Sequence, residues 1–208
     1  MGGTRNCTAG RRLDQLRVAK LLLDYFDELG VVAVLGGSMA SSLIGEPRAT
    51  NDVDLAAALT HDTATRLIGK LGEAFYADPA AIQEAVTYRS SFNVIHLATA
   101  TKVDVFVLGD GLLDRRQASR RVQIEVADED KTLLWVSSPE DQVLRKLAWY
   151  RLGQEVSDRQ WRDIRAMLQV QEGTLDRVDL ESAARELGLV DLLHRAIREA
   201  GIAEPGIS

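Results

Sequence analysis

Three aspartates stand in apolar, β-branched segments where ionised side chains are unexpected. Asp52 and Asp54 are separated by one residue in "TNDVDLAAAL", and Asp104 lies in "TKVDVFVLG". Side chains two apart in a strand point to the same face of a sheet, roughly 6.5–7 Å apart along the chain. Asp52 and Asp54 therefore share a face, and Asp104 can join them if its strand is a neighbour.

Three carboxylates in one place repel each other and lose hydration, so their charge needs compensation. Protonation, pairing with arginines, or a divalent cation would each supply it. Mg²⁺ prefers oxygen ligands, keeps several waters and is usually completed by substrate phosphates. Taken alone, Asp52 and Asp54 are equally well explained as a polar strand end that discourages edge pairing, and Asp104 as an ion-paired edge residue.

A candidate phosphate-binding turn precedes the paired aspartates. The run "VVAVL" over 31–35 predicts a buried strand, Gly36, Gly37 and Ser38 form a turn, and a short helix is expected after it. Glycine lets backbone N–H groups approach a ligand, and a helix N-terminus offers unpaired N–H groups to phosphate. The turn lacks the lysine of a P-loop, and a tight strand-to-helix connection explains it when it is taken alone. Its combination with the aspartates favours a metal–nucleotide site.

The remaining patterns predict a mixed α/β (α+β) region over residues 1–137, followed by an all-helical region over 138–208. Residues 1–10 are expected to be loose. Helices are predicted over 11–30 and over 61–76 with Phe75 on the apolar side, and a helix or helical turn is predicted over 110–121. Strands are predicted over 50–57, 91–99, 102–108, 122–126 and 132–138, with 91–99 and 102–108 as an antiparallel pair.

The C-terminal region carries strong helix-start signals. Ser138 is a favoured N-cap residue, and Pro139 follows it at the first helical position. Ser157 opens the next helix, with Gln160 three residues later as in a capping box. Two further helices are expected over 179–188 and 189–201.

The composition is that of an ordinary globular protein. The 208 residues are 46% hydrophobic and 27% charged, with a formal net charge of −6. That charge disfavours a protein that depends on non-specific nucleic-acid binding, but it is compatible with an enzyme that binds RNA locally. The single Cys7, the lack of an apolar run of about 20 residues and the absence of a signal-like start favour a cytoplasmic location with no membrane contact.

The quoted motifs resemble the nucleotidyltransferase superfamily of the DNA polymerase β type. Its pattern is a hydrophobic strand, a glycine turn, a helix, D-x-D and a third aspartate on a later strand. The string "GGSMASSLIGEPRATNDVDL" is similar to the branch that contains the AbiEii abortive-infection toxins. The segment "SPEDQVLRKLAWYRLG…SDRQWRDI" resembles the helical region of that branch, with Lys146, Arg159 and Asp163 at matching positions.

The resemblance implies a two-metal mechanism. Asp52 and Asp54 would hold the Mg²⁺ that carries the triphosphate, and Asp104 would complete a second metal position and help to deprotonate the acceptor hydroxyl. The nucleotide-binding residues that it implies are Gly36, Gly37, Ser38, Arg48, Thr50 and Lys146. A solvated lysine is an equal alternative for Lys146, and a surface i, i+4 ion pair is the alternative for Arg159 and Asp163.

The expected substrate is an NTP, whose NMP would pass to a hydroxyl of RNA, tRNA or protein in a toxin–antitoxin-like role with a possible antitoxin partner. Arg115, Arg116, Arg120 and Arg121 are the candidate contacts for an RNA backbone, although a solvated helix face is the favoured interpretation. Two alternatives are an adenylyltransferase acting on aminoglycosides or lincosamides, and a non-catalytic binding protein or antitoxin of the same fold.

Overall fold

The computed structural model describes residues 4–45, 52–126 and 131–202, with the side chains of the first helix described from Leu13 onward. Contacts divide the chain into two compact units. The first comprises Met1–Ala40 and Ala49–Ser137, and the second comprises Ser41–Arg48 and Ser138–Ser208.

A mixed sheet forms the frame of the first unit. Over the described residues it has seven strands in the order β3-β4-β5-β2-β1-β7-β6. Strand β1 runs parallel to β7 and β2 runs parallel to β5, whereas the other neighbours are antiparallel. The strands are Ala33–Leu35 (β1), Val53–Ala57 (β2), Phe75–Ala77 (β3), Ser91–His96 (β4), Thr101–Val107 (β5), Val122–Glu125 (β6) and Leu133–Val136 (β7).

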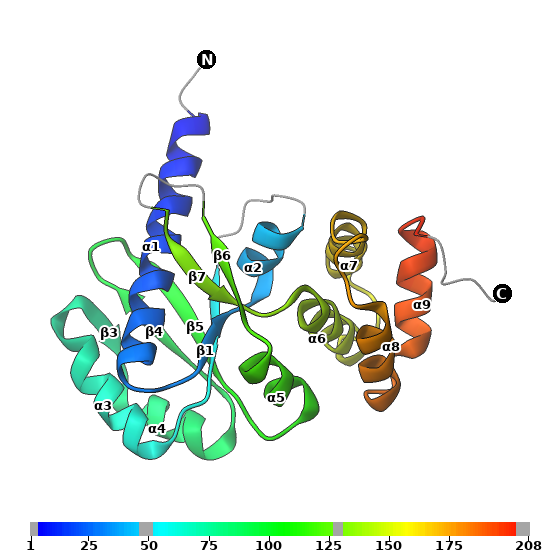
Figure 1. Ribbon diagram of the computed structural model, residues 1–208. Coiled ribbons are helices and arrows are strands. Elements are labelled where there is room, and N and C mark those ends of the chain that lie inside the picture. The colour runs from blue at the N-terminus through cyan, green and yellow to red at the C-terminus, as the bar shows by residue number, and fades with distance from the viewer. Residues whose placement is uncertain (1–3, 46–51, 127–130, 203–208) are drawn as a thin grey trace. The chain divides into compact units, whose positions relative to one another are not determined.

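One face of this sheet is covered by helices α1 (Thr4–Glu28), α3 (His61–Leu71) and α4 (Pro79–Tyr88). Helix α1 contacts β1, β2, β5 and β7, and Figure 1 shows it lying across the strands. Its Phe26 is fully buried, as are the strand residues Val53, Leu55 and Val103. Burial of these apolar side chains supplies the main driving force for this unit.

Helix α5 (Leu112–Ser119) packs on the opposite face, where it contacts β1. Val34 and Ala56 point to that face because they alternate with Leu35 and Leu55 along their strands. They form a small apolar cluster with Leu108, against which Ala118 of α5 packs. Polar side chains further along the same face of β2 therefore lie outside the main core.

The predicted fold class is confirmed, and two of the predicted helices differ in extent from the observed ones. Helix α1 begins at Thr4, earlier than residue 11. The helix predicted over 61–76 was wrong beyond Leu71: a 3-10 turn, Gly72–Ala74, follows, and Phe75 begins the edge strand β3, where it pairs with His96. Gly72 has φ +51°, which a glycine adopts without strain, so the chain can leave the helix there.

Helix α4 was not predicted at all. The side chain of Asp78 accepts hydrogen bonds from the backbone of Ala80 and Ala81, and Pro79 occupies the first helical position. These are ordinary helix-start signals. The helix buries Ile82 and Val86 and contacts β4 and β5.

The second unit is helical. It contains α6 (Pro139–Leu152), α7 (Asp158–Val170), α8 (Arg177–Glu186) and α9 (Val190–Glu199), together with the end of α2 (Gly37–Ile44). The predicted N-caps are present: Ser138 accepts from Asp141 N, and Ser157 accepts from Gln160 N. Glu140 of α6 accepts from Asp176 N at the start of α8 over 3.0 Å, which ties the two helix starts together.

A polar network joins α7 to α9 in this unit. The indole N–H of Trp161 donates to Glu199 Oε2 over 2.7 Å, and Arg195 donates to Glu199 Oε1 over 2.9 Å. These two bonds lower the pKa of the Glu199 carboxyl. Their stabilising effect is therefore present above the pKa of the unfolded chain and is lost as the pH falls through the lowered value.

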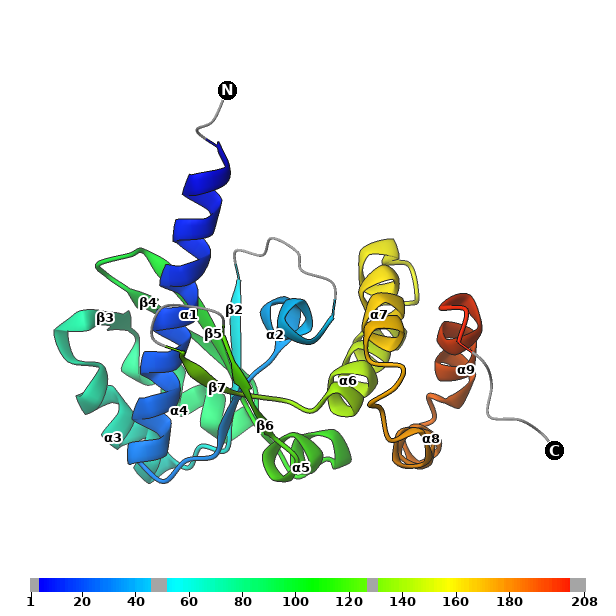
Figure 2. The same ribbon diagram turned by 45° about the horizontal axis from the view of Figure 1, so that its top comes forward.

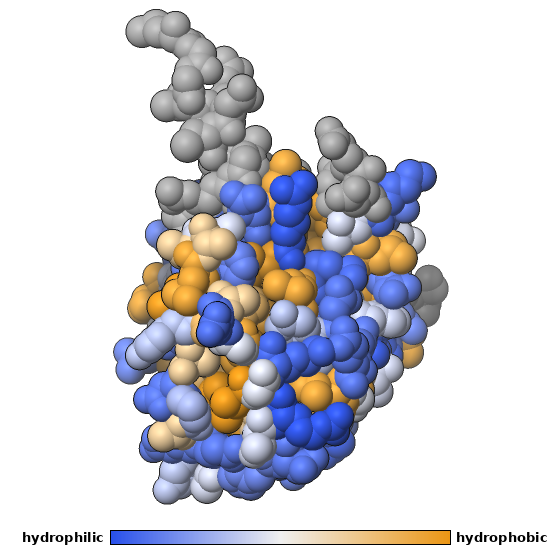
Figure 3. Space-filling model, turned by 90° about the vertical axis from the view of Figure 1, so that its left-hand side faces the viewer, coloured by the Kyte–Doolittle hydropathy of each residue, from blue (hydrophilic) through white to orange (hydrophobic). Residues whose placement is uncertain are grey.

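The surface of the first unit carries both polar and apolar side chains. Figure 3 shows one face, on which hydrophilic side chains are interrupted by apolar patches. Of the helices in the described part of the chain, none has both the length and the apolar character that crossing a bilayer requires.

The packing of α6 leads to a stability prediction. Leu144 is fully buried, whereas Leu152 on the same helix is 75% exposed. We expect Leu144→Ala to lower the free energy of unfolding by about 2–5 kcal/mol, because it removes buried methyl groups and leaves a cavity. The matched Leu152→Ala should change it by about 0.5 kcal/mol or less. Urea unfolding measures both, and equal effects would contradict the packing described for α6.

Candidate functional site

Strands β2 and β5 are parallel neighbours, and their register places two of the candidate aspartates side by side. Asp54 pairs with Asp104, and Val53 pairs with Val103. Neighbouring strands lie about 4.8 Å apart, and register partners point to the same face. Both valines are fully buried on the α1 side, so Asp54 and Asp104 project from the opposite face, where both are half-buried. Figure 2 gives a view in which β2 and β5 can be followed.

Asp52 lies differently. It precedes the first residue of β2 and is exposed. Among the residues that the structure describes, no three His, Cys, Asp or Glu side chains are placed to hold a metal ion together. The structure thus brings Asp54 and Asp104 together, with Asp52 immediately before the first residue of β2.

The glycine turn packs directly against Asp54. Gly36 N donates to the backbone oxygen of Asp54 over 2.8 Å. Gly37 has φ +59°, and a Cβ atom added there would lie 1.8 Å from Asp54 Oδ2. Only glycine fits this position, because both the backbone conformation and the neighbouring carboxylate exclude a side chain. Ser38 follows in the first turn of α2, and Ala40 N donates to Gly36 O over 3.1 Å.

Asp104 has a cationic neighbour on its own strand. Lys102 Nζ lies 2.9 Å from Asp104 Oδ1 and 3.1 Å from Oδ2. The side chain of Lys102 is 54% exposed and that of Asp104 is 24% exposed. Because the two residues are separated by one position in the strand, they share the face that also carries Asp54.

Asn93 extends the polar row onto β4. It pairs in register with Asp104, so Asp54, Asp104 and Asn93 stand next to one another across three strands. Asn93 is exposed, whereas Phe92 and Val94 are buried. The sequence reasoning missed both Asn93 and Lys102. The alternation within "SFNVIH" was a usable signal for Asn93, because it sets this residue opposite to its apolar neighbours.

The other predicted nucleotide-binding residues fall elsewhere. Arg48 and Thr50 lie outside the described residues. Lys146 belongs to α6 of the second unit, where its Nζ lies 3.1 Å from Asp163 Oδ2. The two side chains are only 12% and 13% exposed, so the alternative of a solvated Lys146 does not hold. Arg159, one turn before Asp163 on α7, is exposed.

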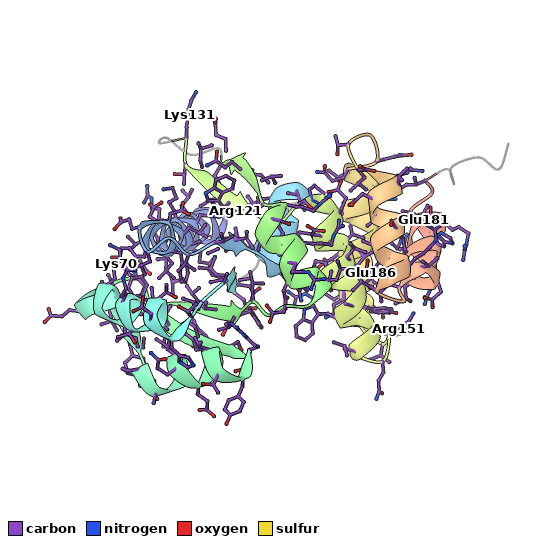
Figure 4. The ribbon with its side chains drawn as sticks, turned by 60° about the horizontal axis from the view of Figure 1, so that its bottom comes forward. Lys70, Arg121, Lys131, Arg151, Glu181 and Glu186 are labelled. Carbon is purple, nitrogen blue, oxygen red and sulfur yellow. The ribbon has the colours of Figure 1, made fainter. Side chains whose placement is uncertain are left out.

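Two of the four arginines proposed as RNA contacts are engaged within the first unit. The guanidinium carbon of Arg121 lies 4.1 Å from the centre of the Trp135 ring, and Nη1 donates to Ala33 O over 3.2 Å. Arg115 donates to the backbone oxygen of Asp110. Figure 4 labels Arg121. These contacts give at least these two side chains a structural role.

Comparison with known proteins adds evidence at the level of the fold. No protein family matches the sequence, and no curated protein matches it. Among solved structures, the chain is similar to an antigenic nucleotidyltransferase-like protein from Paracoccidioides brasiliensis, with a TM-score of 0.54 and 17% identity over 89% of this chain and 91% of that one. It is also similar to the antibiotic-resistance factor ANT(2'')-Ia, with a TM-score of 0.51 and 13% identity over 88% of this chain and 97% of that one. The protein therefore has a nucleotidyltransferase-like fold.

The contact between Gly37 and Asp54 leads to a mutational prediction. We expect Gly37→Ala to lower the free energy of unfolding by at least about 1–3 kcal/mol, because the new methyl group meets the carboxylate and the backbone conformation is strained. Gly69→Ala is the control: it lies in α3 with nothing within 4 Å, so it should stabilise the protein by about 0.5–1 kcal/mol. Chemical denaturation measures both. A Gly37→Ala variant as stable as the native protein would show that the turn does not pack as described.

Proposed function

We propose that the protein is a Mg²⁺-dependent nucleotidyltransferase that transfers an NMP from an NTP to a hydroxyl group. The observation that carries this proposal is the in-register pair Asp54 and Asp104, with the Gly37 backbone packed against the first of them. A helix start, a glycine backbone and two adjacent carboxylates are together suited to holding a metal-bound triphosphate.

The donor set fits Mg²⁺. The ion is usually bound through one or two carboxylates, with waters and substrate phosphates completing its octahedron. Asp54 and Asp104 supply hard oxygen ligands from adjacent strands, and Asp52 lies immediately before the strand that carries Asp54. When bound, the metal would neutralise charge on the phosphates and on the attacking oxygen. A second metal position that includes Asp104 is part of the proposal.

The roles of the chain's own residues follow from their positions. Gly36, Gly37 and Ser38 would orient the outer phosphates through backbone N–H groups and the start of α2. Asp104 would accept the proton of the acceptor hydroxyl, directly or through bound water. Because the carboxylates stand on a sheet with a packed core behind it, the geometry is set before substrate binds, which favours catalysis by positioning and charge stabilisation.

Three further residues are proposed as nucleotide contacts on the strength of the sequence resemblance. Arg48 and Thr50 precede the aspartates in the sequence, and the resemblance implies that they bind the nucleotide. Lys146 would contribute its positive charge to the phosphates, and Asp163 would hold its side chain in place before the nucleotide arrives.

The acceptor is proposed from the resemblance to the AbiEii branch. It would be tRNA or another RNA, or a protein, and an antitoxin would be the natural partner. The second candidate is a small cationic drug of the aminoglycoside or lincosamide kind, which the net charge of −6 would suit. A non-catalytic binding protein of the same fold is the third, and retention of all three aspartates argues against it.

The aspartate pair can be tested by neutral, nearly isosteric substitution. We expect Asp54→Asn and Asp104→Asn each to reduce nucleotidyl transfer by about 100-fold or more, because each removes a carboxylate that would hold the metal, and Asp104→Asn also removes the proton acceptor. Asp62→Asn, an exposed position in the first turn of α3, is the matched control and should retain full transfer. Thermal unfolding checks that the variants fold. Full activity in folded Asp54→Asn or Asp104→Asn would remove the basis of the proposal.

The acceptor can be identified by finding which molecule receives the labelled NMP from an α-labelled NTP. Each of the four α-labelled NTPs is incubated with Mg²⁺, the protein and, in separate reactions, tRNA, total cellular protein or a panel of aminoglycosides and lincosamides. We expect label in tRNA or protein, dependent on Asp104. Label in the drugs alone would support the second candidate, and no metal-dependent transfer or NTP binding in any reaction would contradict an enzymatic role.

A further inference from the structure

The sheet face that carries the aspartate pair also carries its own cation. Lys102 and Asp104 are two residues apart on β5 and project from the same face. The ammonium group lies 2.9 Å from one oxygen of Asp104 and 3.1 Å from the other, so it sits in front of the carboxylate rather than beside one corner. Sequence patterns gave Lys102 no role.

That position conflicts with a metal ion. Mg²⁺ binds carboxylate oxygens at about 2.0–2.1 Å and demands a nearly ideal octahedron. An ammonium group that contacts both oxygens of Asp104 occupies space in front of them, and its positive charge repels a divalent cation at close range. In the arrangement seen here, Lys102 and a metal therefore compete for the lone pairs of Asp104 that face the ammonium group.

We propose that Lys102 is an exchangeable counter-ion: it neutralises Asp104 while no metal is bound and must be displaced before Asp104 can bind a divalent cation. This inference rests on the proposed function, because it assumes a metal at Asp54 and Asp104. It adds a residue that tunes the affinity of the site for its metal and neutralises Asp104 until the metal binds.

The exposure of the pair makes the exchange feasible. With the Lys102 side chain 54% exposed, its ammonium can return to water without unfolding any element. Exposed ion pairs are weak and are screened by salt. A metal competing with such a pair loses apparent affinity in proportion to the fraction of molecules in which the pair is closed. Once displaced, the flexible lysine stem leaves a cation near the site, able to meet an anionic group of the substrate.

The test measures metal binding directly, without substrate turnover. Mn²⁺, added as MnCl₂, replaces Mg²⁺, and the free ion is quantified by electron paramagnetic resonance on the full chain without nucleotide. We expect Lys102→Met to bind Mn²⁺ about two- to fivefold more tightly than the native protein, because the competing pair is gone. Lys102→Arg keeps the charge and the pairing and should bind like the native protein. The difference between Lys102→Met and the native protein should narrow at high ionic strength.

Two controls separate this inference from the proposed function. Lys70→Met removes a lysine of α3 that pairs with Glu28 of α1, on the face of the sheet opposite to Asp104, and should leave Mn²⁺ binding unchanged. Asp54→Asn should weaken binding in every background. If Asp54-dependent binding is present but Lys102→Met binds Mn²⁺ equally or more weakly, the counter-ion role is overturned and the metal site stands. If the native protein shows no binding that depends on Asp54, the metal site and the inference both fall.

Discussion

The parallel pairing of β2 with β5 is the constraint on which the rest of the site depends. Its register sets Val53 beside Val103 and Asp54 beside Asp104. The valines are buried under α1, so a slip of one residue would turn charged groups into the core and apolar groups out. The hydrophobic core thereby fixes the position of the carboxylates. Charge repulsion between the two aspartates is the cost of this arrangement, and Lys102 offsets part of it at Asp104.

The turn between β1 and α2 is coupled to the same strand. Gly36 bonds to the backbone of Asp54, and the missing side chain of Gly37 leaves room for its carboxylate. A phosphate cradle and a metal ligand would therefore be built as one structure, in which moving either disturbs the other. This coupling explains why two glycines, a helix start and an aspartate occur together in this part of the sequence. In the account proposed here it sets the distance between triphosphate and metal.

Local sequence patterns were enough to predict much of the fold. They did not encode the pairing of strands that are distant in the sequence. The period of two in β2 and β5 identified the faces of Asp54 and Asp104, and the cap residues Ser138 and Ser157 marked their helices. Apolar residues at helical spacing continue up to Phe75, so the edge strand β3 was predicted as the end of a helix. Pairing with β4 decides the conformation of this segment, and no local pattern encodes that pairing. For the same reason, the sequence alone did not show that Asp54, Asp104 and Asn93 are neighbours, because this depends on the register of three strands.

The most direct test of the account is to locate the metal. Crystals of the protein soaked with MnCl₂ and a non-hydrolysable NTP analogue would show Mn²⁺ by its anomalous scattering. The account predicts a peak within coordination distance of carboxylate oxygens of both Asp54 and Asp104, with the outer phosphates against the Gly36–Ser38 turn and Lys102 withdrawn from Asp104. A bound nucleotide with Mn²⁺ elsewhere, or with Lys102 still closed on Asp104, would contradict it.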